Sequence, residues 1–233
     1  MDIPAPQWEG AVNARHLAGD IYRMGRSEWL TERGWQQVYD DGVRTVIDLR
    51  NPGERTRRPT DPVVGEAAMA RFAVVNSPTE DPDNPDYAAL FHPYMNHPRL
   101  YADILRLFPE RVATVFKELA AAEGKVVMHC SAGRDRTGLV ATMLLRLLGA
   151  DVEAVARQDD LASRGINSWH LVAPVKHPYE HFLPEHEIAE VVADRERALD
   201  VFVGGLDVQA FLLANGVSAA EVAAIKARCQ EQK

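Results

Sequence analysis

The feature that most constrains this chain is a short loop between two strongly apolar segments. Residues 126–128 read Val-Val-Met, which is typical of a buried strand, and residues 137–148 are apolar on nearly every face, which predicts a central helix ending near Gly149. Such a loop aims its backbone N–H groups and the positive end of the helix dipole at one point. The sequence therefore predicts an anion site here, of the kind that holds a phosphate group.

The side chains of this loop suit covalent chemistry on phosphorus. At a helix N-terminus beside arginines, Cys130 is expected to be a thiolate, which can attack phosphorus and form a phosphocysteine. Arg136 can grip two phosphate oxygens through its planar guanidinium. Asp135 is the candidate donor of a proton to the leaving group. The other candidate phosphate-binding residues in and beside the loop are Ser131, Ala132, Gly133, Arg134, Thr137 and His129. The Thr137 hydroxyl is also placed to ease departure of the thiolate.

The string His-Cys-x-Ala-Gly-x-Asp-Arg-Thr-Gly, at residues 129–138, resembles the protein tyrosine phosphatase superfamily. Within it, the loop is similar to the bacterial tyrosine and lipid phosphatase group, in which Lys usually stands at the position of Arg134. Residues 13–25 resemble the N-terminal signature of that group in part, with His16 in place of Asp. Asp48-Leu49-Arg50 matches a strand-end signature of the group, and the carboxyl ends of strands are where open α/β sheets bind ligands.

The resemblance implies a fold and an activity. The expected fold is one α/β domain, residues 1–233, with a mostly parallel sheet flanked by helices and with residues 184–229 as a helical lid. The expected activity is hydrolysis of phosphotyrosine, and of phosphoserine, phosphothreonine or phosphoinositides, with inorganic phosphate as product and no cofactor. A phosphoinositide-specific lipid phosphatase is the alternative. Asp48 and Arg50 are expected to contribute to substrate binding.

Two rival functions are weaker. Sulfurtransferases and arsenate reductases also use a cysteine loop, but they lack the Asp-Arg-Thr-Gly ending, and the reductases need a resolving cysteine for which only Cys229 is present. A phosphate-binding pseudophosphatase would keep Arg136 but usually lose Cys130. Because this chain has both residues, the sequence favours an enzyme.

Composition limits the setting and the partners. The net charge of −8 argues against a nucleic-acid partner, which needs a basic face. Two cysteines far apart, no basic-then-apolar start and no long apolar run predict a reducing, cytoplasmic location, with export by another route left open. No metal is expected, although four histidines follow one another closely: His170, His177, His181 and His186.

The rest of the chain is interpreted from its periodicity and its Gly and Pro punctuation. Short strands at most are expected in residues 1–26, and strands in residues 45–49 and 71–76. Helical patterns cover residues 31–41, 94–122 with a break at Pro109, 151–163, 184–203, 206–213 and 218–229, and irregular chain is expected in residues 77–93 and 168–184. The paired glycines at 204 and 205 suggest a hinge for the lid.

Three further assignments stay open. The loop at residues 50–59 carries four arginines, which are either solvated or make transient contact with a membrane surface or an acidic peptide. Arg15 is either structural or site-lining. The general acid is taken as Asp135, with the alternatives in the long polar connection being Asp81, Asp83 and Asp86. Asp160 stands where the family often has Tyr, so no role is carried over to that segment.

Overall fold

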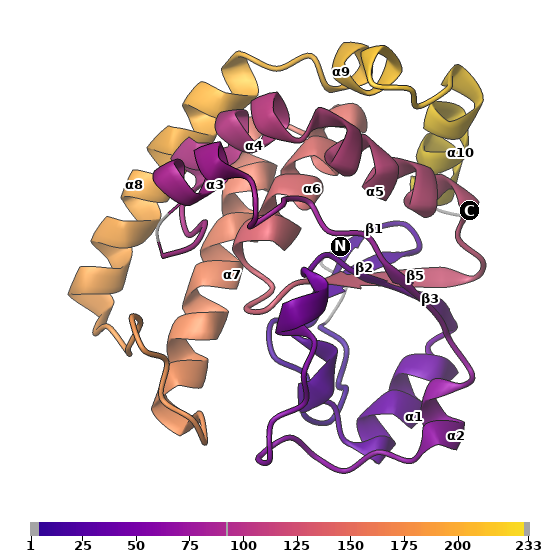
Figure 1. The fold of residues 1–233 in the computed structure, drawn as a ribbon, viewed down its shortest axis with the longest axis vertical. Coiled ribbons are helices and arrows are strands. Elements are labelled where there is room, and N and C mark those ends of the chain that lie inside the picture. The colour runs from indigo at the N-terminus through magenta and orange to yellow at the C-terminus, as the bar shows by residue number, and fades with distance from the viewer. Residues whose placement is uncertain (1–4, 92, 231–233) are drawn as a thin grey trace.

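The computed structural model describes residues 5–91 and 93–230, and a five-stranded sheet runs through its centre (Figure 1). The strands are β1 (Arg15–Ala18), β2 (Ile21–Met24), β3 (Val43–Asp48), β4 (Ala73–Asn76) and β5 (Lys125–His129). They lie in the order β1-β2-β5-β3-β4, with only the β1–β2 pair antiparallel. The expectation of a mostly parallel sheet is thus confirmed. The first four residues of the N-terminal segment lie outside the described ranges.

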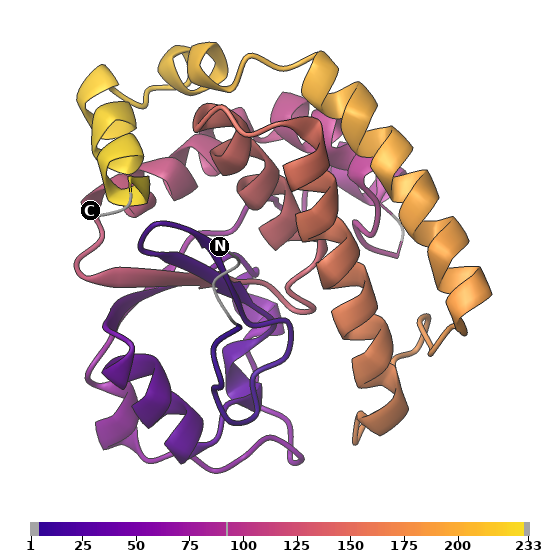
Figure 2. The same ribbon diagram turned by 180° about the vertical axis from the view of Figure 1, so that it is seen from behind.

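Helices cover both faces of the sheet, because its central strand is apolar on both sides. In β5, Val127 packs with Trp35 and Val38 on one face, whereas Val126 and Met128 belong to the larger core on the other. The first face carries α1 (Glu32–Asp40) and α2 (Glu66–Met69), and the second carries most of the other helices (Figures 1 and 2). These are α3 (Pro85–Leu90), α4 (Tyr101–Leu107), α5 (Pro109–Ala121), α6 (Asp135–Leu147), α7 (Val152–Val172), α8 (Glu185–Gly204), α9 (Val208–Ala214) and α10 (Ala219–Cys229).

Three elements differ clearly from those expected, and the first is α4, which begins at Tyr101 and not near residue 94. The helix that starts after its N-cap Asp151 runs to Val172, well past Ser163, since no helix breaker occurs before Pro174. The long polar connection contains α3, which begins at Pro85 after an Asn84 side chain that accepts hydrogen bonds from the N–H groups of Asp86 and Tyr87. Both signals were present in the sequence.

The carboxyl ends of the parallel strands meet at one edge of the sheet. In register, Met24 of β2 and Asp48 of β3 both lie beside His129 of β5, and Asp48 lies beside Asn76 of β4. The segments that leave these strand ends therefore converge on the loop that follows His129.

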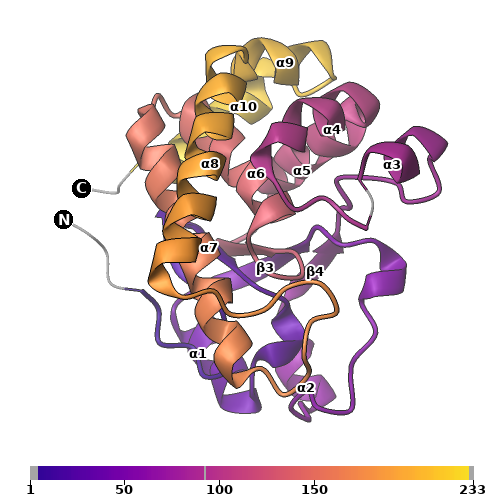
Figure 3. The same cartoon turned by 90° about the vertical axis from the view of Figure 1, so that its left-hand side faces the viewer.

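The C-terminal segment, residues 184–229, divides into two parts. Helix α8 packs along α7 and reaches the loop after β5 (Figure 3). By contrast, α9 packs on α6 and α10 on α5, and α10 lies at the opposite end of β5, where Arg228 donates hydrogen bonds to the carbonyls of Ala122 and Gly124. Leu212 of α9 and Ile225 of α10 are fully buried in the larger core. Of these three helices, only α8 reaches the loop, through Arg195 and Asp135.

None of the helices in the described ranges is both long enough and apolar enough to span a bilayer.

Candidate active site

Residues outside the loop at 130–134 fix its path by donating hydrogen bonds to its carbonyl groups. The backbone N–H of Arg26 donates to Ser131 O at 2.9 Å, Asn13 Nδ2 donates to Ala132 O at 2.8 Å, and Arg23 Nη2 donates to Gly133 O at 2.7 Å. In a trans peptide unit the N–H points opposite to the C=O. The N–H groups of the three following residues, 132 to 134, therefore point toward the inside of the loop, where α6 begins at Asp135.

A glycine is required at position 133 for two reasons. Its φ is +70°, a conformation that L side chains rarely adopt, and an added Cβ would lie 2.4 Å from the backbone oxygen of Met24. The loop thus passes closer to the end of β2 than any other residue type would allow.

Cys130 lies at the floor of a cavity of about 350 Å³. Its side chain is almost fully buried, and it follows His129 directly at the end of β5. The cavity is also lined by Ser131, Ala132, Arg134, Asp135 and Arg136, so the loop forms one continuous wall. Thr137 does not line the cavity, and its buried Oγ1 has no hydrogen-bond partner among the described residues.

Two carboxylates orient Arg136. Glu54 accepts from Nη1 at 2.5 Å and from Nη2 at 2.7 Å, and Glu80 lies 3.2 Å from Nη1. Burial alone would lower the pKa of Arg136, but Glu80 and Glu54 raise it well above its usual value. Nε has no acceptor among the residues that the structure describes. The N–H of Nε and one N–H of Nη2 are therefore left without an acceptor among those residues.

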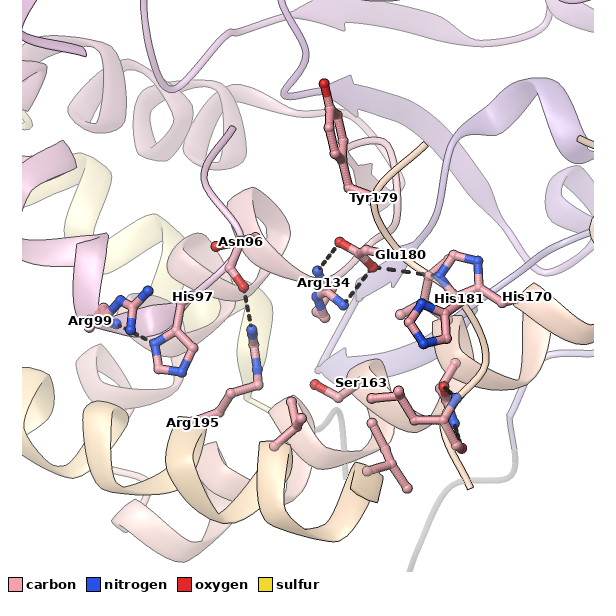
Figure 4. A pocket seen from close by; sticks show the side chains of 15 residues that line it. Asn96, His97, Arg99, Arg134, Ser163, His170, Tyr179, Glu180, His181 and Arg195 are labelled. Carbon is pink, nitrogen blue, oxygen red and sulfur yellow. Dashed lines mark hydrogen bonds and ion pairs between the residues drawn. The ribbon is translucent and has the colours of Figure 1, made fainter. Parts of the chain in front are cut away.

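A chain of buried charges continues from the loop toward α7 and α8. Arg134 donates from Nε to Asp135 at 2.9 Å and holds Glu180 with both Nη atoms at 3.1 and 2.8 Å (Figure 4). The other Asp135 oxygen lies 3.0 Å from Nη2 of Arg195, which forms two hydrogen bonds to Asp159. Burial alone would raise the pKa of Glu180, yet Arg134 lowers it to about 2. Glu180 thus ties the α7–α8 connection to the loop.

The cavity walls above the loop are largely apolar. Trp29 and Trp169 lie with ring centroids 4.9 Å apart, and Met95, Ile166 and Val175 line the cavity beside them. Arg58 and Lys176, both exposed, stand at its edge. A charged floor below an aromatic wall suits an aryl phosphate ester.

Several residues selected from the sequence lie outside this cavity. Asp48 and Arg50 are buried beneath the loop, where Arg50 Nη2 lies 2.8 Å from both Asp48 and Glu28, so neither lines the cavity. His129 is buried there too, 3.8 Å from Asp48, and burial lowers its pKa, which favours the neutral ring. Arg15 donates to the side chain and the carbonyl of Gln158 and so braces α7.

The residues whose roles the sequence left open lie in different parts of the structure. Asp81 pairs with Arg111 at 2.7 Å, and Asp83 and Asp86 are exposed; none of the three lines the cavity. Of the four loop arginines, Arg50 is buried and unavailable to a membrane surface, Arg55 pairs with Asp48 and Arg57 donates to the carbonyl of Pro62. Asp160 pairs with Arg164. Within residues 5–91 and 93–230, no group of three His, Cys, Asp or Glu side chains could hold a metal ion.

Sequence reasoning missed the residues that support the loop from a distance. Glu54, Glu80, Glu180 and Arg195 lie 46 to 82 positions away from the loop residues that they contact. Asn13 was noted only as part of a partial signature, yet it adopts φ +60° and donates to both Ala132 O and Ala162 O. Its tolerance of positive φ was the one available local signal.

Comparison with known proteins gives a family match over nearly the whole chain. The profile of a family described as the tyrosine phosphatase family matches residues 7–231. A protein of Cupriavidus necator, named as a candidate tyrosine-protein phosphatase, is 31% identical over 159 residues, which cover 66% of this chain and 55% of that protein. The chain thus spans about half the length of this curated relative.

Solved structures align with most of the chain at low similarity. P. aeruginosa TpbA gives a TM-score of 0.47 at 20% identity, over 91% of this chain and 99% of TpbA. The core catalytic domain of the PP-IP phosphatase SIW14 from S. cerevisiae, crystallised with citrate, gives 0.42 at 11% identity, over 83% and 95% of the two chains. Because these TM-scores are low, the fold is assigned from the strand order and pairing given above.

Proposed function

Because this chain belongs to the tyrosine phosphatase family, we propose that it hydrolyses phosphate monoesters through a phosphocysteine on Cys130, with phosphotyrosine as its preferred substrate. The observation that carries the proposal is the outward anchoring of the Ser131, Ala132 and Gly133 carbonyls around Cys130. It leaves three N–H groups for the phosphate, next to the open Nε edge of Arg136.

The first chemical step is attack of the Cys130 thiolate on phosphorus. A sulfur–phosphorus bond forms, the ester oxygen–phosphorus bond breaks, and the leaving phenolate takes a proton from Asp135. In the second step water attacks phosphorus, Asp135 takes a proton from it, and the sulfur–phosphorus bond breaks. Inorganic phosphate is the product, and the cysteine returns to a thiolate.

Asp135 is our choice of acid by comparison with the other carboxyls that line the cavity. Burial would raise the pKa of Glu54 and of Glu180, but Arg136 lowers that of Glu54 and Arg134 lowers that of Glu180. In both of them each carboxylate oxygen accepts an arginine hydrogen bond, which holds the ionised form, whereas Asp135 Oδ1 accepts none among the described residues. Asp135 is the remaining lining carboxyl among the described residues, and the loop places it five positions from Cys130.

The substrate preference rests on the shape of the wall. A phenyl ring can stack near Trp29 and Trp169 while its phosphate reaches Cys130, whereas the short arm of phosphoserine or phosphothreonine leaves these surfaces uncovered. Phosphoinositides are the second candidate, because the exposed Arg58 and Lys176 at the cavity edge could bind further phosphates of an inositol ring. Since turnover needs the Cys130 thiol, we place the enzyme in a reducing compartment such as the cytoplasm.

The test compares two cysteine variants. We expect Cys130→Ser to lose turnover of nitrophenyl phosphate while it still binds inorganic phosphate, and Cys229→Ser, the matched control at the other free thiol, to turn over like the parent. Quenching the parent enzyme early in turnover should trap phosphate on the peptide that contains Cys130. Activity in Cys130→Ser beyond a trace would refute the mechanism.

A second measurement addresses the substrate. The kcat/KM for phosphotyrosine peptides is expected to exceed that for the matched phosphoserine peptides and for a short-chain phosphoinositide. A higher kcat/KM for the phosphoinositide would reverse the order of the two candidates.

A further inference from the structure

A second cavity, of about 290 Å³, lies beside the first on the far side of the Arg134–Glu180 pair. Figure 4 shows it between Asn96, Arg195, Ser163 and Arg134. The two cavities share Ile166, Arg134, His170 and Glu180 as lining residues. A single ligand that extends past this shared wall could therefore occupy both.

The second cavity contains buried donors without acceptors. Ser163 is 2% exposed, its Oγ has no hydrogen-bond partner among the described residues, and Figure 4 shows this oxygen pointing into the cavity. Arg195, also 2% exposed, has five N–H bonds. Three of them donate hydrogen bonds to Asp159 and the Asn96 carbonyl, and Nη2 also lies 3.0 Å from Asp135 Oδ1, so at least one N–H, on Nη1, has no acceptor among the described residues. Arg134 uses three of its five in the bonds described above, which leaves one on each Nη.

These donors would be satisfied by a ligand that carries several hydrogen-bond acceptors. A buried hydroxyl and guanidinium N–H groups lose free energy when no acceptor reaches them. Carboxylate and phosphate oxygens are the acceptors that guanidinium groups bind best.

The charges around the second cavity favour a ligand with a single negative charge. With the proton that the proposed acid Asp135 carries, Arg134 and Arg195 are already balanced by Glu180 and Asp159. Arg99, exposed at the edge of the cavity, forms no ion pair with any residue in the described ranges, since the nearby Asp194 pairs with His97 and Arg197. One unbalanced cation matches a carboxylate monoanion better than a phosphate dianion.

We infer that this cavity is a subsite for an acidic side chain, Asp or Glu, that flanks the phosphotyrosine of a peptide substrate. The inference rests on the phosphatase function proposed above. The phosphate would lie on the Cys130 loop and the carboxylate between Ser163, Arg195 and Arg99, with the Arg134–Glu180 pair between them. The enzyme would thus select acidic phosphopeptides.

The test uses pairs of phosphotyrosine peptides that carry Glu or Gln at each flanking position in turn, with kcat/KM measured for both members. At one position the Glu peptide should be favoured about tenfold, the effect of one charge-assisted hydrogen-bonded contact. Arg99→Gln and Ser163→Ala should each bring this ratio close to one. Arg106→Gln, a matched exposed arginine that pairs with Asp103 and lies outside the cavity, should leave the ratio unchanged.

Other outcomes overturn the inference. A parent enzyme that turns over nitrophenyl phosphate but shows no Glu preference at any position would show that the cavity takes no acidic side chain. A preference that survives in both variants would place the acidic contact elsewhere. If free glutamate stimulated turnover of the Gln peptides, and Ser163→Ala abolished the stimulation, the cavity would bind a free carboxylate and not the substrate's own. If the parent enzyme did not turn over nitrophenyl phosphate at all, the phosphatase function itself would be refuted.

Discussion

Replacing Gly133 by Ala tests whether the shape of the loop depends on its close approach to β2. The added Cβ would lie 2.4 Å from Met24 O, which is 1.0 Å short of the 3.4 Å at which ordinary contact begins. The neighbour is backbone, so no side chain can swing aside. A displacement of roughly 1 Å at a reacting centre costs about a hundredfold in rate. We therefore expect kcat/KM for nitrophenyl phosphate to fall at least that far.

The same substitution should reduce stability. The left-handed conformation costs an alanine about 1–2 kcal/mol, and overpacking adds about 1–3 kcal/mol, so the free energy of unfolding should fall by about 2–5 kcal/mol. Gly149 is the matched control, because its φ is +82° and an added Cβ meets nothing within 4 Å. Gly149→Ala should lose only about 1–2 kcal/mol and keep its activity.

Urea unfolding of both variants, together with steady-state kinetics, checks this reasoning. Equal losses of stability in the two variants would show that the contact with Met24 carries no cost. Parent-like kinetics in a folded Gly133→Ala protein would show that the N–H groups of the loop do not need this exact path.

Three further outcomes are expected. Asp135→Asn should slow phenyl phosphate roughly a hundredfold and nitrophenyl phosphate much less, because the better leaving group needs little protonation; equal losses would remove Asp135 as the acid. Glu180→Gln should destabilise the protein at pH 7 by up to about 3–4 kcal/mol, because Arg134 holds the pKa of Glu180 far below its usual value. Because the pKa of Glu180 is depressed from 4.5 to about 2, this difference from the parent is full above pH 4.5 and should shrink as the pH falls toward 2, which urea unfolding at several pH values would detect. Ile225→Ala should cost about 2–5 kcal/mol if α10 belongs to the core, whereas a loss below 1 kcal/mol would indicate a loosely held appendage.

Local chemistry explains which features were predictable. The strand, the loop and the helix at residues 125–147 are contiguous, so their apolar pattern and turn residues predict a strand–turn–helix unit without help from the rest of the chain. The starts of α1, α7 and α10 were likewise predicted at residues 31, 151 and 218, where the structure has Thr31, Asp151 and Ser218 each accepting a hydrogen bond from a backbone N–H three residues on.

The end of α7 was misjudged although Pro174 marked it. His170, in the last turn of that helix, was expected to lie in an irregular connection. Composition is a weaker guide to a helix end than the first residue that cannot continue the helix.

What the sequence by itself determined is the chemistry of residues 129–138: a cysteine, an arginine and a turn that aims N–H groups at one point. What only the tertiary structure decided is how that turn is held and what surrounds it. Asn13 and Arg23 anchor the carbonyls, Glu54 and Glu80 orient Arg136, and Glu180 fastens the α7–α8 connection to Arg134. These partners are single charged or polar residues far apart in the chain, with no periodicity to mark them. Packing brings them together because the parallel strands end at one edge of the sheet, and a buried charge is stable there only when an opposite charge reaches it.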